Sequence, residues 1–187
     1  MAIRDTAHRK LTYEDYVLIP DDGKRHEILD GEHYVTASPY LRHQAVLGEL
    51  YFWIGNFLRQ NRLGRVFFAP VDVLLSRHDI VQPDLLFISN ERLTALTEKN
   101  VQGAPDLVIE VLSGSTRRID EGLKLERYEL LDVREYWTVD PSRNVVRVYR
   151  RSGDRLRKEV ELTAAAGDCL MTPLLPGLEI PLVEVFQ

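Results

Sequence analysis

The feature that most constrains the fold is a pair of apolar runs that each contain a carboxylate. The runs DIVQPDLLFIS and APDLVIEVLS lie between residues 79 and 113 and are separated by a polar interval. Each is bounded by turn residues and has the length and composition of a buried strand. Asp84 in the first run and Glu110 in the second stand where apolar residues are expected. Because a buried charge is costly unless it is paired, protonated or bound to a metal, these acids predict a polar site inside the sheet.

Earlier elements are predicted from periodicity and turn residues. An Asp-Gly pair between two alternating segments predicts a β-hairpin over residues 24–37. Apolar residues recur at helical spacing from residue 42 to residue 63, and Gly64 stands where a C-terminal cap is expected. We predict residues 79–89 to be one strand.

The order of the later elements predicts a parallel pair of strands. A strand, a helix and a strand follow one another between residues 107 and 139, which favours a right-handed crossover. Short strands continue after residue 153, with glycine and proline breaks. We therefore expect one domain over residues 1–187, α/β in class, with a mixed β-sheet core flanked by helices, an N-terminal β-hairpin and a β-rich C-terminal extension.

Composition narrows the class of protein. The chain is 44% hydrophobic and 28% charged, which is ordinary for a globular domain. Cys169 is the only cysteine, which excludes an intrachain disulfide and a zinc site built from several thiolates. We find no signal-peptide pattern and no run of about 18 apolar residues, so we expect a cytoplasmic protein without a membrane segment. The net charge of −5 argues against nucleic-acid binding, except through local basic patches.

The two buried acids have the chemistry of a divalent-cation site. Mg²⁺ is usually held by one or two carboxylates together with water and substrate phosphate. Strand parity places Glu110 on one face with Asp106, and Pro83 favours a strand end or bulge at Asp84. In the alternative interpretation Asp84 caps a turn and Glu110 pairs with an arginine.

The helix predicted after the second run carries a line of polar residues. Asp120, Lys124 and Tyr128 follow one another at i, i+4 steps, beside Ile119 and Leu123, which we assign to the buried face. A lysine beside two carboxylates can orient an attacking water or offset charge on a phosphate. From periodicity alone, an exposed lysine paired with Asp120 or Glu121 and a core position for Tyr128 are the simpler interpretation.

The Pro-Asp pair at 83–84 followed by Glu110 resembles the motif of the PD-(D/E)xK nuclease superfamily. The ordered segments RHEILDGE, SPYLRHQ, VQPDLLFIS, GAPDLVIEVLS and VREYWTVD, with the D-x-x-x-K-x-x-x-Y helix, resemble more specifically the Uma-type restriction-endonuclease family. The resemblance covers about residues 11–149. It implies a restriction-endonuclease-like core that hydrolyses DNA phosphodiester bonds with Mg²⁺, or with Mn²⁺ in its place.

The resemblance also implies roles for individual residues. Asp84 and Glu110 become metal ligands, and Lys124 supplies the ammonium because Leu112 occupies the superfamily's lysine position. Glu27 resembles an early acidic ligand of the family, although a surface position in the hairpin is equally compatible with its pattern. The accessory candidates are Glu27, Gln82, His43, Asp120 and Tyr128. Gln82 is included because its parity on a regular strand matches that of Asp84.

Basic residues supply candidate contacts to DNA phosphates. These are Arg117 and Arg118 near the start of the predicted helix, and Arg150 and Arg151 near a predicted hairpin turn. A solvated rim is the alternative interpretation of the hairpin arginines.

The leading hypothesis from sequence is a metal-dependent endodeoxyribonuclease, catalytic through Asp84, Glu110 and Lys124. Because cutting both strands of a duplex needs two sites, we expect a homodimer or a higher homo-oligomer. The alternative is a catalytically inactive nuclease-fold module that binds DNA or a protein partner. In a third interpretation the acids are purely structural.

Overall fold

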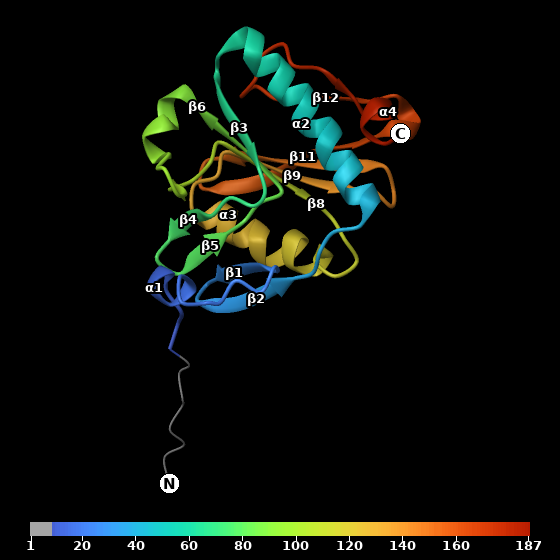
Figure 1. Cartoon of the computed structure of the whole chain (residues 1–187). Coiled ribbons are helices and arrows are strands. Elements are labelled where there is room, and N and C mark those ends of the chain that lie inside the picture. The colour runs from blue at the N-terminus through green and yellow to red at the C-terminus, as the bar shows by residue number, and fades with distance from the viewer. Residues whose placement is uncertain (1–8) are drawn as a thin grey trace.

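The computed structural model describes residues 9–187, so the first eight residues of the expected domain lie outside the described part. The chain builds two main β-sheets, and helices cover both faces of the larger one (Figure 1). In chain order the elements are α1 (Tyr13–Tyr16), β1 (Arg25–Leu29), β2 (Glu32–Thr36), α2 (Leu41–Asn61), β3 (Gly64–Phe68), β4 (Val73–Ser76), β5 (Asp79–Val81), β6 (Leu85–Ser89), η1 (Asn90–Ala95), β7 (Val101–Gln102), β8 (Leu107–Val111), η2 (Ile119–Lys124), α3 (Leu125–Leu130), β9 (Glu135–Asp140), β10 (Val145–Ser152), β11 (Arg155–Thr163), η3 (Ala164–Ala166), β12 (Cys169–Leu170), β13 (Ile180–Pro181) and α4 (Leu182–Val185).

The larger sheet confirms the predicted α/β class and the predicted crossover. Its strand order is β11-β10-β9-β8-β6-β3, and β8 and β9 are parallel, whereas the other neighbours are antiparallel. The smaller sheet has the order β2-β1-β5-β4-β7 and contains the predicted hairpin. A two-stranded β12-β13 sheet and α4 form the C-terminal part.

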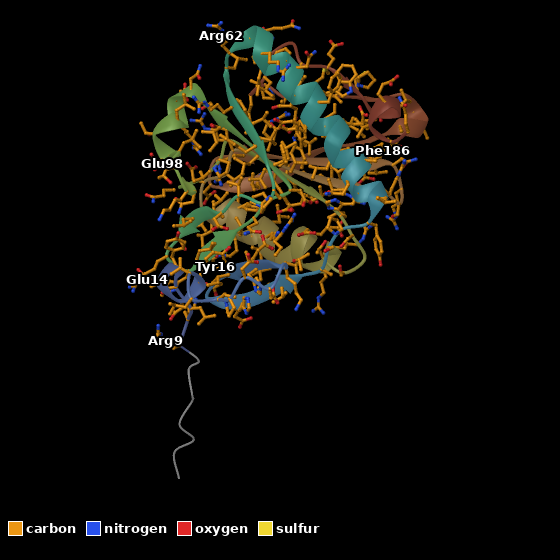
Figure 2. All side chains as sticks on the ribbon, viewed as in Figure 1. Arg9, Glu14, Tyr16, Arg62, Glu98 and Phe186 are labelled. Carbon is orange, nitrogen blue, oxygen red and sulfur yellow. The ribbon has the colours of Figure 1, made fainter. Side chains whose placement is uncertain are left out.

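Two apolar clusters lie on opposite faces of the larger sheet. On one face, Leu50 and Ile54 of α2 join Ile109 of β8 and Trp137 of β9. On the other face, Tyr128 of α3 lies in a cluster with Leu29 and residues of the smaller sheet, so that the helix is held between the two sheets. Figure 2 shows side chains filling the space between these ribbons. In the described residues, none of the helices has the length and apolar content of a bilayer-crossing segment.

The predicted single strand over residues 79–89 is wrong, because the chain leaves one sheet and enters the other within it. β5 belongs to the smaller sheet and β6 to the larger. Pro83 lies in the break, where its missing N–H costs no ladder hydrogen bond. The expectation that Pro83 favours a strand end at Asp84 is confirmed. The break puts Asp84 at the junction of the two sheets.

The expected role of Gly64 as a helix cap is also wrong. The C-cap of α2 is Arg62, which has a left-handed φ of 46° and whose N–H still donates to the Leu58 carbonyl. Gly64 instead begins β3, where an added Cβ would lie 2.1 Å from the Ile88 carbonyl oxygen. The glycine is required by close approach of two strands.

We predict that Gly64→Ala lowers the free energy of unfolding by about 1–3 kcal/mol, the usual cost of overpacking. Gly48 is the matched control, because it lies in α2 and a Cβ there would meet nothing within 4 Å. Gly48→Ala should therefore stabilise by roughly 0.5–1 kcal/mol through helix propensity. Urea denaturation of the two variants checks both signs, and equal midpoints would contradict the close-approach argument.

Candidate functional site

The two buried acids of the sequence lie side by side. Strands β6 and β8 are antiparallel neighbours with Leu85 opposite Ile109, so the residues flanking this pair, Asp84 and Glu110, meet at one end of the ladder. The backbone N–H of Asp84 points to Glu110 Oε2 at 3.4 Å. Both side chains are only 2% exposed. The two strands that carry the acids are therefore neighbours in the sheet.

Asp84 is surrounded by hydrogen-bond donors from three elements. Arg25 of β1 donates to its Oδ1 at 2.7 Å, and His43 of α2 lies 3.1 Å from its Oδ2. The backbone N–H of Val111 donates to the same Oδ2 at 2.8 Å. Burial raises the pKa of Asp84, but His43 and Arg25 outweigh it and lower the pKa to about 2. Asp84 is therefore a carboxylate at neutral pH, and it does not cap a turn.

At Glu110 the effect of burial on the pKa outweighs that of the neighbouring cation. Lys124 Nζ and the Tyr128 hydroxyl both donate to its Oε1 at 2.9 Å. Burial raises the pKa of Glu110 to about 8; Lys124 opposes this shift, and the charge of Asp84 adds to it. The partner of Glu110 is a lysine rather than the arginine of the alternative interpretation.

Lys124 is the cation at the centre of the site. Its Nζ lies 2.9 Å from Glu27, 2.9 Å from Glu110 and 3.6 Å from Asp120. Burial lowers the pKa of Lys124, but the three carboxylates outweigh burial and raise the pKa well above its usual value. Lys124 is therefore an ammonium ion, 3% exposed, and the expectation of an exposed lysine is wrong.

The helix turns a different face inward than we predicted. Asp120, Lys124 and Tyr128 are buried, whereas Ile119 and Leu123 are only half-buried at the edge of the apolar cluster. The reason is electrostatic: the lysine is held by acids on two sheets, and this outweighs the burial of two aliphatic side chains. The segment that carries Asp120 and Lys124 is a π-helix, a form frequent at functional sites.

Glu27 belongs to the site, but the Gln82 side chain points elsewhere. Glu27 is 2% exposed, so a surface position is excluded, and its Oε1 accepts the Gln82 backbone N–H at 2.8 Å. The Gln82 side-chain amide donates to Asp72 at 2.8 Å and to Tyr16 at 3.1 Å. The predicted shared face of Gln82 and Asp84 is wrong, because parity holds only within an unbroken strand. The Gln82 backbone nevertheless positions Glu27.

The acids line a pocket of about 120 Å³. Two loops form its walls: residues 37–40, between β2 and α2, and residues 113–116, between β8 and η2. The lining side chains from the centre of the fold are Arg25, Glu27, His43, Asp84, Glu110, Asp120 and Lys124. Arg25 is the residue that sequence reasoning missed; its signal was parity, because it shares a strand face with Glu27.

The four candidate DNA-contacting arginines do not gather at the pocket. Arg117 donates to Asp140 at 2.7 Å, and Arg150 donates to Glu135 at 2.9 Å. Arg151 donates to backbone carbonyls, including that of Glu129. Arg118 lies two residues after the 113–116 wall and is exposed, and no ion pair of Arg118 is found within residues 9–187. Arg118 is not part of the pocket lining.

The residues of the pocket fit a hard divalent cation. Four carboxylates, those of Glu27, Asp84, Glu110 and Asp120, meet the cations Lys124 and Arg25. Three of these acids, Glu27, Glu110 and Asp120, converge on the single ammonium group of Lys124. Within residues 9–187 no three histidine, cysteine or acidic side chains form a ready metal-ligand group. Mg²⁺ does not require one, since one or two carboxylates with water and phosphate suffice.

Comparison with known proteins places the chain in a family. The family model Uma2, described as "Putative restriction endonuclease", matches residues 13–183. A solved structure from Anabaena variabilis, described as a putative nuclease belonging to DUF820, shares the fold with a TM-score of 0.76 and 18% identity over 94% of this chain and 97% of that chain. The comparison with curated proteins found no match. Since the family model spans most of the sequence, the chain belongs to the Uma2 family of restriction-endonuclease-like proteins.

Proposed function

We propose that this chain is a Mg²⁺-dependent endodeoxyribonuclease, able to use Mn²⁺, in which Asp84 and Glu110 hold the metal ion. The observation that carries the proposal is the convergence of three buried acidic side chains on one ammonium ion, with Asp84 beside them, at the floor of a pocket. Burying such a cluster costs folding free energy unless a bound cation offsets it. Clusters of ionisable groups with shifted pKa values are typical of functional sites. Family membership supplies DNA as the substrate to test.

The residues of the pocket divide into two groups by what they can do. Asp84 is ionised, and Glu110, whose pKa burial raises to about 8, lies beside it; a bound cation would favour the ionised form of Glu110, so that both acids could present carboxylate oxygens to the metal. Glu27 and Asp120 face Lys124 and hold its ammonium group in place. Tyr128 donates to Glu110 and fixes the orientation of that carboxyl group. A bound Mg²⁺ would lower the pKa of a water and offset negative charge on the scissile phosphate.

Lys124 and Arg25 are the groups that can act on the reacting phosphate. In the reaction a water oxygen attacks phosphorus, a P–O bond breaks, and one proton ends on the departing oxygen. Lys124 cannot accept the proton of the attacking water, because its raised pKa keeps it protonated. We assign it to orienting that water and to stabilising the developing negative charge. Arg25 is 22% exposed at the pocket and has further N–H donors for a phosphate oxygen.

The test compares two aspartates that each follow a proline. Asp84→Asn should abolish both calorimetric binding of Mg²⁺ or Mn²⁺ and metal-dependent nicking of plasmid DNA. Asp106→Asn is the matched control, because Asp106 is also buried but its partners are Arg134 and the Ser89 backbone, outside the pocket. It should retain both signals in the folded protein. Wild-type metal binding and nicking in Asp84→Asn would refute the assignment.

The second candidate is a catalytically inactive module of the same fold that binds DNA or a protein partner. Leu112 at the superfamily's lysine position and the net charge of −5 favour it. It predicts DNA or protein binding that is insensitive to Lys124→Ala and no turnover with either metal. The position of Lys124, 2.9 Å from Glu110, favours the enzyme instead.

We also propose that the protein is a homodimer or a higher homo-oligomer. Cutting both strands of a duplex would need two pockets, which a two-fold dimer supplies, and analytical ultracentrifugation would reveal it. We propose that residues 1–187 act as one domain. The free thiol of Cys169 is compatible with a cytoplasmic place of action.

A further inference from the structure

An exposed tyrosine stands at the mouth of the pocket. Tyr40 is 81% exposed, is the N-cap residue of α2, and belongs to the pocket lining. His43, one helical turn further on, contacts Asp84 at the pocket floor. The first turn of α2 therefore connects an aromatic ring at the rim with the acids at the base. Leu41, the next residue, is 89% exposed but is not part of the lining.

The walls of the pocket offer small hydroxyl groups rather than a basic surface. Ser38 lies in one wall, and Ser113 and Ser115 lie in the other, where their hydroxyl groups bond to each other at 3.0 Å. The cations of the lining are Arg25 and Lys124, and each is bound to a carboxylate. A protein that holds a duplex through its backbone neutralises many phosphates with lysine and arginine. This pocket can contact one or two phosphates.

An aromatic ring discriminates between paired and unpaired bases. Within a duplex the faces of a base are covered by its neighbours in the stack, whereas an unpaired base exposes a face on which tyrosine can stack. A narrow pocket with loops on both sides also suits one extended strand better than a double helix. The exposed ring, the hydroxyl groups of the walls and the small number of cations therefore favour an unpaired strand as the substrate.

We propose that the pocket takes an unpaired nucleotide of single-stranded or locally unpaired DNA, with the base on Tyr40 and the phosphate on Arg25. This inference rests on the proposed nuclease function, whose substrate class it narrows. It makes Tyr40 a specificity-determining residue.

The experiment uses three labelled DNAs of the same sequence: a single strand, a complete duplex, and a duplex with a central unpaired loop. Initial rates with Mg²⁺ or Mn²⁺ give the KM for each, and fluorescence anisotropy gives binding. Wild type should prefer the single strand and the looped duplex. Tyr40→Ala should raise the KM for both roughly tenfold and erase the preference. Tyr40→Phe keeps the aromatic ring and should keep the substrate preference. Leu41→Ala is the control at the neighbouring exposed residue and should leave the preference unchanged.

The outcomes separate this inference from the proposed function. Equal cleavage of all three DNAs that is unaffected by Tyr40→Ala would overturn the inference and leave the nuclease intact. If wild type binds the single strand, Tyr40→Ala binds it more weakly and neither cleaves any DNA, the inference is supported and the proposed nuclease activity is refuted. A change of oligomeric state in Tyr40→Ala without a change in KM would also overturn the inference, because the ring would then contact protein.

Discussion

Lys124→Met is expected to lower the free energy of unfolding by about 3–5 kcal/mol and to eliminate nuclease activity, because it leaves several buried carboxylates without their cation. The Lys124 ammonium lies within 2.9 Å of both Glu27 and Glu110, and within 3.6 Å of Asp120. Methionine fills a similar volume, so the cost comes from charge rather than from a cavity. Chemical denaturation followed by circular dichroism measures the loss.

Two further variants identify the physical cause of that loss. Lys158, an exposed lysine of β11, provides the control, and Lys158→Met should change stability by less than about 0.5 kcal/mol. Adding Glu27→Gln to Lys124→Met removes one unpaired charge and should return part of the stability but none of the activity. A Lys124→Met protein as stable as wild type would show that the carboxylates do not depend on this ammonium.

Glu110→Gln is expected to separate stability from activity. The amide is isosteric and can still accept the Tyr128 hydroxyl hydrogen bond, and Lys124 keeps Glu27 and Asp120 as partners. Because burial raises the pKa of Glu110 to about 8, a neutral side chain here costs little at neutral pH. We expect a thermal midpoint within a few degrees of wild type. Loss of one metal ligand should reduce turnover on the order of 10²–10³-fold or more.

A variant in the neighbouring strand β9 should have the opposite effect, a loss of stability without a loss of activity. Glu135 of β9 is 1% exposed, accepts from Trp137 at 2.6 Å and pairs with Arg150 at 2.9 Å, outside the pocket. Glu135→Gln should therefore reduce the thermal midpoint yet retain metal-dependent cleavage. Calorimetric metal titration and plasmid nicking on the two variants complete the comparison. A Glu110→Gln protein that binds Mg²⁺ and cleaves like wild type would eliminate Glu110 as a ligand.

The elements of the fold were predictable where the signal is local. The Asp-Gly hairpin, the long helix and the parallel crossover follow from turn residues and periodicity within short windows, and the structure confirms them. The prediction failed where the chain changes sheets. The apolar run from Asp79 to Ser89 looks continuous, but Pro83 divides it between two sheets and places the Gln82 amide against Asp72.

The amino-acid sequence by itself determined the hairpin, the long helix and the parallel pair of strands, and that two acids, Asp84 and Glu110, interrupt apolar segments. Strand parity and the missing N–H of proline act along the chain, so these features can be predicted from the sequence. Lys124 was expected beside those acids only from the family resemblance, and the tertiary structure decided which other charges meet them. Lys124 comes from a helix and Arg25 from the other sheet, and no local pattern encodes a contact made across such distances. The burial of the lysine follows from that assembly, because its cost is offset only when acids from several elements converge on it.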